Sequence, residues 1–301
     1  MIDCATSGRI DAPVAGSAPS LAEAWAALEH RSGVLPLIET FFAAPGAFVE
    51  VVAGRMRGAL GLFTPAPEPG WGAAAVEGEL SEGRLLLRGD VRLPGPTADG
   101  SIVPVRLPDG EHRLAWVDHQ APGVERRGSR SGGAVGDGPC WLHMDAMVIT
   151  SDLVSRPVTL APDGELSRHL AAYAGVWASA AAVSARDGVR ALRRAARTAA
   201  FQTSQLVALG ITEVEIEADL TFAAVQRNPG RLHGLGVAAA AARTLAAVTA
   251  KTEELRDSFG LEIDGPLTAG SVKTLTAFLG GSLLLESELA RVLGIGEAQA
   301  G

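Results

Sequence analysis

The chain has 301 residues, and 47% of them are apolar, which is enough to fill one large core or several smaller ones. Acidic residues (34) outnumber basic ones (26), and the resulting net charge of -8 would repel a phosphate backbone. No run of Lys and Arg is interleaved with aromatic residues either, so the sequence excludes nucleic acid as a partner.

Membrane insertion and export are also disfavoured. A membrane-spanning helix needs about 18 uninterrupted apolar residues or more, and the alanine-rich segment 237–250 is broken by Arg243. Residues 1–9 include Asp3 and lack an apolar core behind a basic start, so they do not form a signal peptide. We therefore expect a cytoplasmic protein without a membrane partner.

Proline divides the chain into two parts. Fifteen of the seventeen prolines lie at or before Pro162, leaving Pro229 and Pro266 in the remainder. Because proline breaks helix interiors, the part after Pro162 is free to be helical and the part before it largely is not. We predict three segments: a residual N-terminal helical segment (1–47), a β-domain (48–162) and a C-terminal helical bundle (163–301).

The segment from Ser20 to Phe42 has the pattern of one or two short helices. Leu21, Trp25 and Leu28 recur at helical spacing, and Ser20 is a candidate N-cap. This indicates a short amphipathic helix before the β-domain.

Between Phe48 and Val158 the pattern changes to short runs of β-branched or alternating residues. Gly, Pro and Asp clusters separate these runs, which include 84–87, 102–106 and 114–117. Such runs are strand and turn signals, so we expect a small antiparallel barrel or sandwich. The glycine-rich segment 128–138 is expected to be a loop.

The helical part begins with a clear apolar stripe. Residues 164–226 contain no proline, and one face carries Leu170, Tyr173, Trp177 and Ala181. This face is expected to point to the core.

A second stripe follows in the same segment. It is formed by Leu209, Ile216, Leu220 and Ala223, and we expect it to face the core as well. Thr212 and Glu215 fit a capping box, which predicts that the helix breaks at Gly210.

Two more helices are expected, at 238–259 and 271–293, and short loops between helices of this length favour an up-and-down four-helix bundle. The predicted fold class is therefore α+β, with a small antiparallel β-domain followed by the bundle. Residues 234–239 (GLGVAA) superficially match a dinucleotide-binding glycine pattern. They follow Asn228-Pro229-Gly230 rather than a strand, so a helix start is favoured.

Several short stretches resemble acyl-CoA dehydrogenases in the right order. The β-domain feeding a helical bundle has the family's layout, and matching stretches span roughly residues 50–295. They are GALGLFT (58–64), LLLRGD (85–90), LAWVDHQAPGV (114–124), the strand at 141–157, the Phe201-Gln202 pair and LGG (279–281).

The resemblance implies a flavoprotein that binds FAD and oxidises an acyl thioester or a related small molecule. In the family, a β-domain Thr and the Arg, Gln and Gly-Gly of a neighbouring subunit's bundle hold the flavin. The matching positions are Thr64, Arg197, Gln202, Gly280 and Gly281. Arginine would offer a planar donor fork, and the glycines a close backbone approach. A homo- or hetero-oligomer with an acyl-CoA dehydrogenase-like subunit is therefore expected.

The sequence also departs from the family's pattern. Gly70-Trp71-Gly72 stands in place of Gly-Ser-Asp, and Val91-Arg92-Leu93 stands where an aromatic residue would cover the flavin ring. Residues 1–47 are short for the family's N-terminal helical domain. Two alternatives remain open: a catalytically degenerate structural partner of a complete dehydrogenase, or the same fold reused for a non-redox small-molecule reaction.

No catalytic base can be assigned from the sequence. The Glu-Gly-Thr segment that carries the family's base does not occur before Gly301, and Glu165 is the only acid at the start of the first bundle helix. A glutamate at a helix start is commonly there because the helix dipole favours it. We therefore expect that the chain alone does not oxidise acyl-CoA substrates.

Metal sites are not expected. Cys140 and His143 should lie on opposite faces of one strand because their separation is odd. His112 and His119 lie on different segments without a third ligand, and both are expected to be solvated.

Overall fold

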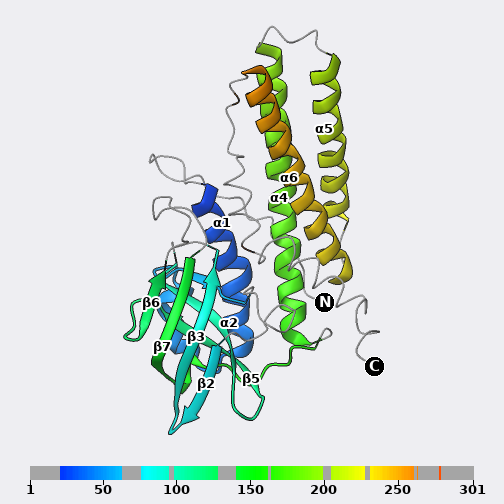
Figure 1. The fold of residues 1–301 in the computed structure, drawn as a ribbon. Helices are drawn as coiled ribbons and strands as arrows, with labels where there is room; N and C mark the ends of the chain where they lie inside the picture. Colours follow the sequence, from blue (N-terminus) through cyan, green and yellow to red (C-terminus); the bar gives the residue numbers. More distant parts are fainter. Residues whose placement is uncertain are drawn as a thin grey trace, which may run out of the picture.

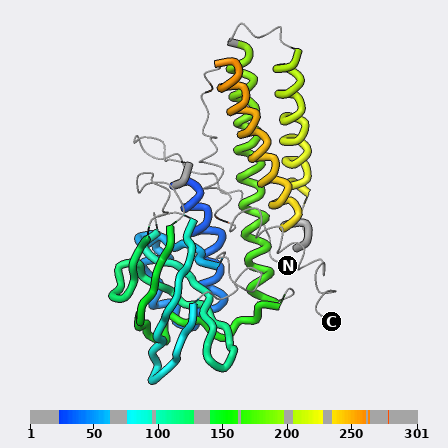
Figure 2. Tube along the Cα trace, in the orientation of Figure 1, coloured from blue at the N-terminus to red at the C-terminus, as the bar shows by residue number. Residues whose placement is uncertain are grey.

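The structure is a computed structural model that describes residues 21–62, 76–94, 98–127, 140–161, 164–198, 205–227 and 231–260, together with Ile263 and Phe278. Within these residues the fold is mixed α+β. Short N-terminal helices lie against a curled, half-barrel sheet, and three long helices extend away from it (Figure 1). The chain trace in Figure 2 follows the same order from the blue N-terminal helices through the sheet to the long helices.

The expected N-terminal helices are confirmed, with a π-helical turn between them. The elements are α1 (Leu21–Glu29), the π-helix η1 (His30–Val34), α2 (Leu35–Phe41), the short 3-10 helix η2 (Pro45–Phe48) and α3 (Val49–Val52). Trp25, Leu37 and Phe41 are buried against the rest of the molecule. The π-turn adds a residue to one turn, which changes the face presented by the residues around it.

The strands pair in the order β1-β4-β2-β3-β7-β6, with β5 on the other edge of β4. Their bounds are β1 (Gly58–Leu60), β2 (Val76–Ser81), β3 (Arg84–Leu93), β4 (Gly100–Arg106), β5 (His112–Asp118), β6 (Val124–Arg127) and β7 (Cys140–Thr150). β4 runs parallel to β1 along residues 100–102 and parallel to β2 along residues 105–106. The expectation of a purely antiparallel sheet is therefore wrong for these two pairs.

A bulge in β7 explains why its side-chain alternation changes phase. Cys140, Leu142 and Met144 are buried, and then Met147 and Ile149, so the buried parity shifts between Met144 and Met147. The pairing with β3 skips at the same place, and Ala146 there has φ +52°. One extra residue in β7 re-aims the following side chains into the same core.

Close packing at the start of β4 requires a glycine. A Cβ atom on Gly100 would lie 2.3 Å from Cζ2 of Trp116, which lies on the neighbouring strand β5. The indole therefore occupies the space that any larger residue would need.

The three long helices are α4 (Glu165–Thr198), α5 (Gln205–Gln226) and α6 (Arg231–Phe259), and they pack against one another. The predicted α4 stripe is confirmed, since its four members are buried: Leu170, Tyr173, Trp177 and Ala181. Residues 234–239 lie inside α6, in agreement with the helical interpretation.

The predicted fourth helix at 271–293 lies outside the described residues apart from Phe278. The Phe278 ring contacts Trp25 of α1, with a centroid distance of 6.3 Å, and Trp25 contacts Trp177 of α4 at 5.6 Å. Phe278 therefore packs on the α1 side of α4. The glycine-rich loop predicted at 128–138 also lies outside the described residues.

Two predictions for α5 are wrong. The stripe formed by Leu209, Ile216, Leu220 and Ala223 is exposed, while the opposite face is buried: Val207, Ile211, Val214, Ala218 and Val225. α5 has two apolar stripes, and the smaller, largely β-branched one fits between α4 and α6. Helical periodicity alone does not choose between them.

α5 also does not break at Gly210. The Thr212 hydroxyl donates to the Ala208 carbonyl at 2.8 Å, so it bonds back within the helix instead of capping one. Glu215 forms an ion pair with Arg193 of α4. A Cβ atom at position 210 would lie 3.1 Å from Nζ of Lys251 on α6. Glycine at this position therefore leaves room for the lysine side chain.

No helix in the described ranges combines the length and apolar character needed to cross a bilayer.

Candidate functional site

Of the five residues that the resemblance assigns to flavin, the described residues include Arg197. The other four, Thr64, Gln202, Gly280 and Gly281, lie outside them. Arg197 is exposed in the last turn of α4. The rise from Glu165 to Arg197 is about 48 Å at 1.5 Å per residue, and Figure 1 shows α4 starting beside the sheet and running away from it. Arg197 therefore lies far from the sheet of its own chain.

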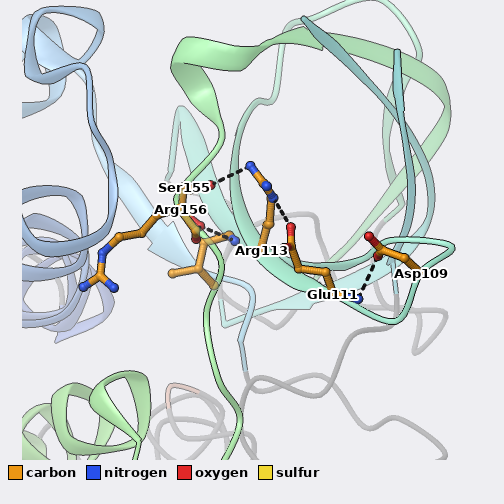
Figure 3. Close-up of polar contacts among 6 residues, drawn as sticks. Asp109, Glu111, Arg113, Ser155 and Arg156 are labelled. Atoms are coloured by element: carbon orange, nitrogen blue, oxygen red, sulfur yellow. Dashed lines mark hydrogen bonds and ion pairs between the residues drawn. The ribbon is translucent and has the colours of Figure 1, made fainter.

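The start of α4 is held to β5 by the segment that precedes it, after the short helix η3 (Ser151–Leu153). Leu114 donates its backbone N–H to the Ser155 hydroxyl at 2.7 Å, and the Arg113 guanidinium donates to the Ser155 carbonyl at 3.4 Å. Glu111 pairs with Arg113 at 2.6 Å. Figure 3 shows these side chains beside the curled sheet, with Arg156 directed away toward the helices. This arrangement fixes where Arg156 points.

Arg156 joins α2 and α4. Its guanidinium forms an ion pair with Glu165 and lies 5.0 Å from the ring centroid of Phe41. The Phe41 ring meets the His169 ring edge-on at 5.6 Å, and Nε2 of His169 lies 3.3 Å from the Thr40 hydroxyl. These contacts lock the start of α4 against α2.

The electrostatics of Glu165 do not suit a base that removes a carbon-bound proton. The hydrogen bond from Arg156 holds the pKa of the Glu165 carboxyl below its usual value. A base for an α-proton needs the opposite, a dry site that raises its pKa toward neutrality. Glu165 is also solvent-exposed, so its helix-start interpretation is favoured.

Glu29 is a buried carboxyl group that the sequence reasoning missed. It is 1% exposed, and its Oε1 accepts the Leu60 backbone N–H at 3.1 Å. The adjacent His30 accepts the Gly58 N–H through Nδ1 at 3.0 Å. Burial raises the pKa of Glu29 well above its usual value, and Glu29 in turn helps burial to raise the pKa of Tyr173. The available signal was its position four residues after Trp25, on the buried stripe of α1.

His119 is buried as well, which corrects the expectation that it is solvated. Its Nδ1 lies 2.9 Å from the Ala98 carbonyl and its Nε2 lies 3.1 Å from the Ser101 hydroxyl. The guanidinium of Arg126 on β6 contacts both the Ala98 carbonyl and the imidazole. Burial, and then Arg126, lower the pKa of His119 to about 4. Because Ser101 is fully buried, this Ser-His pair meets no substrate and instead holds β6 to the start of β4.

A groove of about 400 Å³ lies on the sheet's outer surface, lined in part by Glu77, Glu79, Arg88 and Arg106. The strand register places Glu77 beside both Arg88 and Arg106. Charges of both signs alternate there, so the groove presents neither an apolar slot for an acyl chain nor a field of one sign.

A metal site is not found within the described ranges, where no cluster of three His, Cys, Asp or Glu ligands occurs. Cys140 is buried, whereas His143 is partly exposed and pairs with Asp90 at 2.9 Å. Cys140 and His143 therefore lie on opposite faces of β7, as the odd spacing between them predicted.

No protein-family model matches the sequence, and no curated protein matches it significantly. Solved structures do match its fold. A chain of the ChsE4-ChsE5 complex from Mycobacterium tuberculosis is 18% identical with a TM-score of 0.69, covering 91% of this chain and 79% of that one.

Two dehydrogenases match over a similar span. Glutaryl-CoA dehydrogenase from Mycobacterium smegmatis is 15% identical with a TM-score of 0.73, covering 89% of this chain and 74% of that one. Butyryl-CoA dehydrogenase from Megasphaera elsdenii is 13% identical with a TM-score of 0.67, covering 87% and 75%. The chain therefore has an acyl-CoA dehydrogenase-like fold.

Proposed function

We propose that this chain is a subunit of an acyl-CoA dehydrogenase-like flavoprotein that acts on an acyl thioester or a related small molecule. In the proposed assembly, FAD is held between the sheet of one chain and the bundle tip of another. The observation that carries this proposal is the position of Arg197, about 48 Å along α4 from the end that adjoins the sheet. A flavin site that uses both ends of this layout needs two chains.

The described residues fit FAD in part. The exposed guanidinium of Arg197 suits a diphosphate, because its planar donors match phosphate oxygens. On the sheet side, Val91 and Leu93 are buried in the sheet's own core and offer no aromatic cover for the ring. FAD, when bound, would supply the hydride acceptor. The chain's own contribution would be to orient the cofactor, and we expect it to do so weakly without a partner.

Neither Glu165 nor Glu29 suits the removal of a carbon-bound proton. Glu165 is accessible, but its pKa is lowered, and Glu29 has a raised pKa but is buried. The lack of a suitable base at both positions is expected of a subunit that relies on its partner for the base. The alternative, a non-redox structural partner or a reused fold, rests on the same observation, and the match to one chain of a two-component complex is compatible with either.

Three finer points stay with this proposal. We infer that residues 271–293 supply the fourth helix of the bundle, a proposal that the contact of Phe278 with Trp25 supports. The division at residues 47 and 162 and the cytoplasmic location remain predictions from the sequence.

The flavin test compares the visible absorption of the purified chain alone and after co-expression with a full-length acyl-CoA dehydrogenase-like homologue. We expect little flavin after dialysis of the chain alone and bound flavin in a co-purified complex. Arg197→Gln should lower the flavin content of the complex, and Arg194→Gln, one turn earlier, is the matched control. Stoichiometric flavin in the chain alone would contradict the shared site, and its absence from both samples would favour the non-redox alternative.

A second expected result concerns Glu165. Glu165→Gln removes an exposed ion pair with Arg156, and such pairs contribute little to stability. We expect a nearly unchanged melting temperature and no change in turnover of any active complex, measured with an artificial electron acceptor. Turnover by the chain alone that Glu165→Gln abolishes without unfolding would instead make Glu165 the base.

A further inference from the structure

The second half of β2 has one edge without a strand beside it. β2 pairs with β3 over its whole length, but its parallel pairing with β4 stops where Glu77 meets Arg106. The chain then turns away, and the Leu107 N–H donates to the Glu111 carbonyl at 2.8 Å. Within the described residues, no strand continues beside residues 78–81, and Figure 1 shows the end of β2 projecting from the sheet. We call residues 78–81 the open edge of β2.

The hairpin between β2 and β3 determines which main-chain groups face this edge. Its two turn residues, Glu82 and Gly83, have φ of 50° and 75°, as a type I′ turn requires. In such a hairpin the two residues that flank the turn bond to each other, and bonded pairs alternate from there. Ser81 and Glu79 therefore direct their main-chain groups to β3. Leu80 directs its N–H and its carbonyl to the open edge.

The side chains of the open edge divide by face. Leu80 shares the inner face with its buried partner Leu85 on β3, yet Leu80 is 45% exposed. Glu79 is exposed on the outer face opposite Leu86, and it forms no ion pair among the described residues. The preceding acid, Glu77, lies between two arginines in the strand register. The open edge thus offers one apolar side chain inside and one uncompensated carboxylate outside.

The groove of about 400 Å³ described above opens onto this edge. Its lining includes Gly78 and Glu79 on one side and Leu107 and Pro108 on the other. Strand residues rise about 3.3 Å each, so the open edge at 78–81 is about 10–13 Å long and matches three to four residues of an extended segment. The groove volume lies in the range of ligand sites.

We propose that the open edge of β2 binds an extended segment of a partner protein in which one Lys or Arg stands between two apolar residues. The segment adds a strand to β2 in the place that β4 leaves. In this mode of recognition, main-chain hydrogen bonds supply affinity and alternate side chains supply specificity. The basic side chain meets Glu79 on the outer face, and the apolar side chains cover Leu80 and Leu107 on the inner face. The proposal goes beyond the flavin site and does not depend on it.

A second copy of β2 is a poorer occupant. Two antiparallel β2 strands centred on Glu79 would place both Glu79 side chains directly opposite each other, and like charges in that position destabilise a strand pair. Pairing centred on Leu80 would bring Gly78 opposite Glu82, where the positive φ has already ended the strand. The charge of the edge therefore favours a basic segment of another protein.

The first test is binding of a fluorescently labelled peptide, acetyl-Val-Lys-Val-Thr-amide, to the full chain, measured by anisotropy. Saturable binding is expected, with a dissociation constant on the order of 100 µM for so few contacts. Glu79→Lys should raise that constant at least tenfold. Glu82→Lys makes the same charge change in the adjacent turn and is the matched control, which should bind as wild type does. A peptide with Glu in place of Lys should bind Glu79→Lys more tightly than wild type. Circular dichroism checks that each variant is folded.

The second test is amide hydrogen exchange by NMR, which reports on the main chain directly. The Leu80 N–H should exchange rapidly in the free chain and at least tenfold more slowly with saturating peptide. The Glu79 N–H, which is directed to β3, should be protected in both samples. A peptide N-methylated at alternate main-chain nitrogens should not bind.

Three results would overturn the proposal without bearing on flavin binding. The first is no saturable binding up to about 1 mM peptide, ten times the expected constant. The second is an equal loss of binding in Glu79→Lys and Glu82→Lys. The third is a Leu80 N–H that is already protected without peptide, which would mean that the chain itself covers the edge.

Discussion

Lowering the pH from 7 to 4 is expected to reduce the free energy of unfolding by about 3 kcal/mol through His119 alone, because its folded pKa of about 4 lies well below the ordinary 6.5. Both states carry a neutral imidazole above pH 6.5, so the group then has no differential effect. Below that pH the unfolded chain binds a proton that the folded protein excludes. Stability is therefore lost as the pH falls toward 4.

The cause is the confined site at the join of β6 and β4. Nδ1–H of His119 donates to the Ala98 carbonyl, which leaves Nε2 to accept from the Ser101 hydroxyl. A second ring proton would require the Ser101 hydroxyl to turn from donor to acceptor, and it would add a positive charge beside Arg126. Asp118 and Asp99 act in the opposite sense, but burial and Arg126 outweigh them.

The measurement is denaturant unfolding of wild type and His119→Asn between pH 7 and pH 4. Asparagine retains a donor for the Ala98 carbonyl but does not titrate, so the difference between the two proteins isolates the imidazole from carboxylates that titrate below pH 5. The wild type should lose about 3 kcal/mol more than the variant over this range. Parallel pH profiles would show that His119 is accessible to protons in the folded state.

Glu29→Gln is expected to stabilise the protein at pH 8 by about 1–3 kcal/mol. This is the usual cost of burying a polar group whose hydrogen bonds to water are not fully replaced within the protein. The pKa of Glu29 is raised by burial, so the folded protein retains a proton that the unfolded chain loses above about pH 4.3. This costs stability progressively as the pH rises toward the folded pKa. Glutamine has nearly the same shape and still accepts the Leu60 N–H through its side-chain oxygen.

The gain should nearly disappear at pH 4, where Glu29 is protonated in the folded protein and in most unfolded chains. Glu39→Gln on the exposed side of α2 is the matched control and should leave the pH profile unchanged. A Glu29→Gln variant that is less stable than wild type at pH 8 would mean that the native carboxylate is ionised and is bound by a group that glutamine cannot satisfy.

The sequence predicted those parts of the fold in which the pattern of apolar residues allowed a single interpretation. The α4 stripe around Trp177 had no competing face, and its burial is confirmed. The division at residue 162, which the proline distribution suggested, remains a prediction. β7 was harder, because the extra residue at Ala146 moves the buried positions to the other parity and defeats a simple alternation.

The site was less predictable because polar residues change character when distant segments meet. His119 is buried by contacts with Ala98 and Arg126, and nothing local to its sequence indicates them. α5 offered two apolar faces, and only the packing of α4 and α6 decides which one is covered. The flavin roles of Thr64, Arg197, Gln202, Gly280 and Gly281 remain predictions from the resemblance.

The contacts between α1 and Phe278 also bear on how the protein is made. Trp25 leaves the ribosome early, whereas Trp177 and Phe278, which pack against it, are translated much later. Thr40 likewise precedes its partner His169 by 129 residues. Contacts so distant in sequence form slowly. During synthesis the part of α1 and α2 that packs on α4 would stay uncovered while the sheet is translated, so the nascent chain would present a binding surface for holding chaperones until α4 emerges.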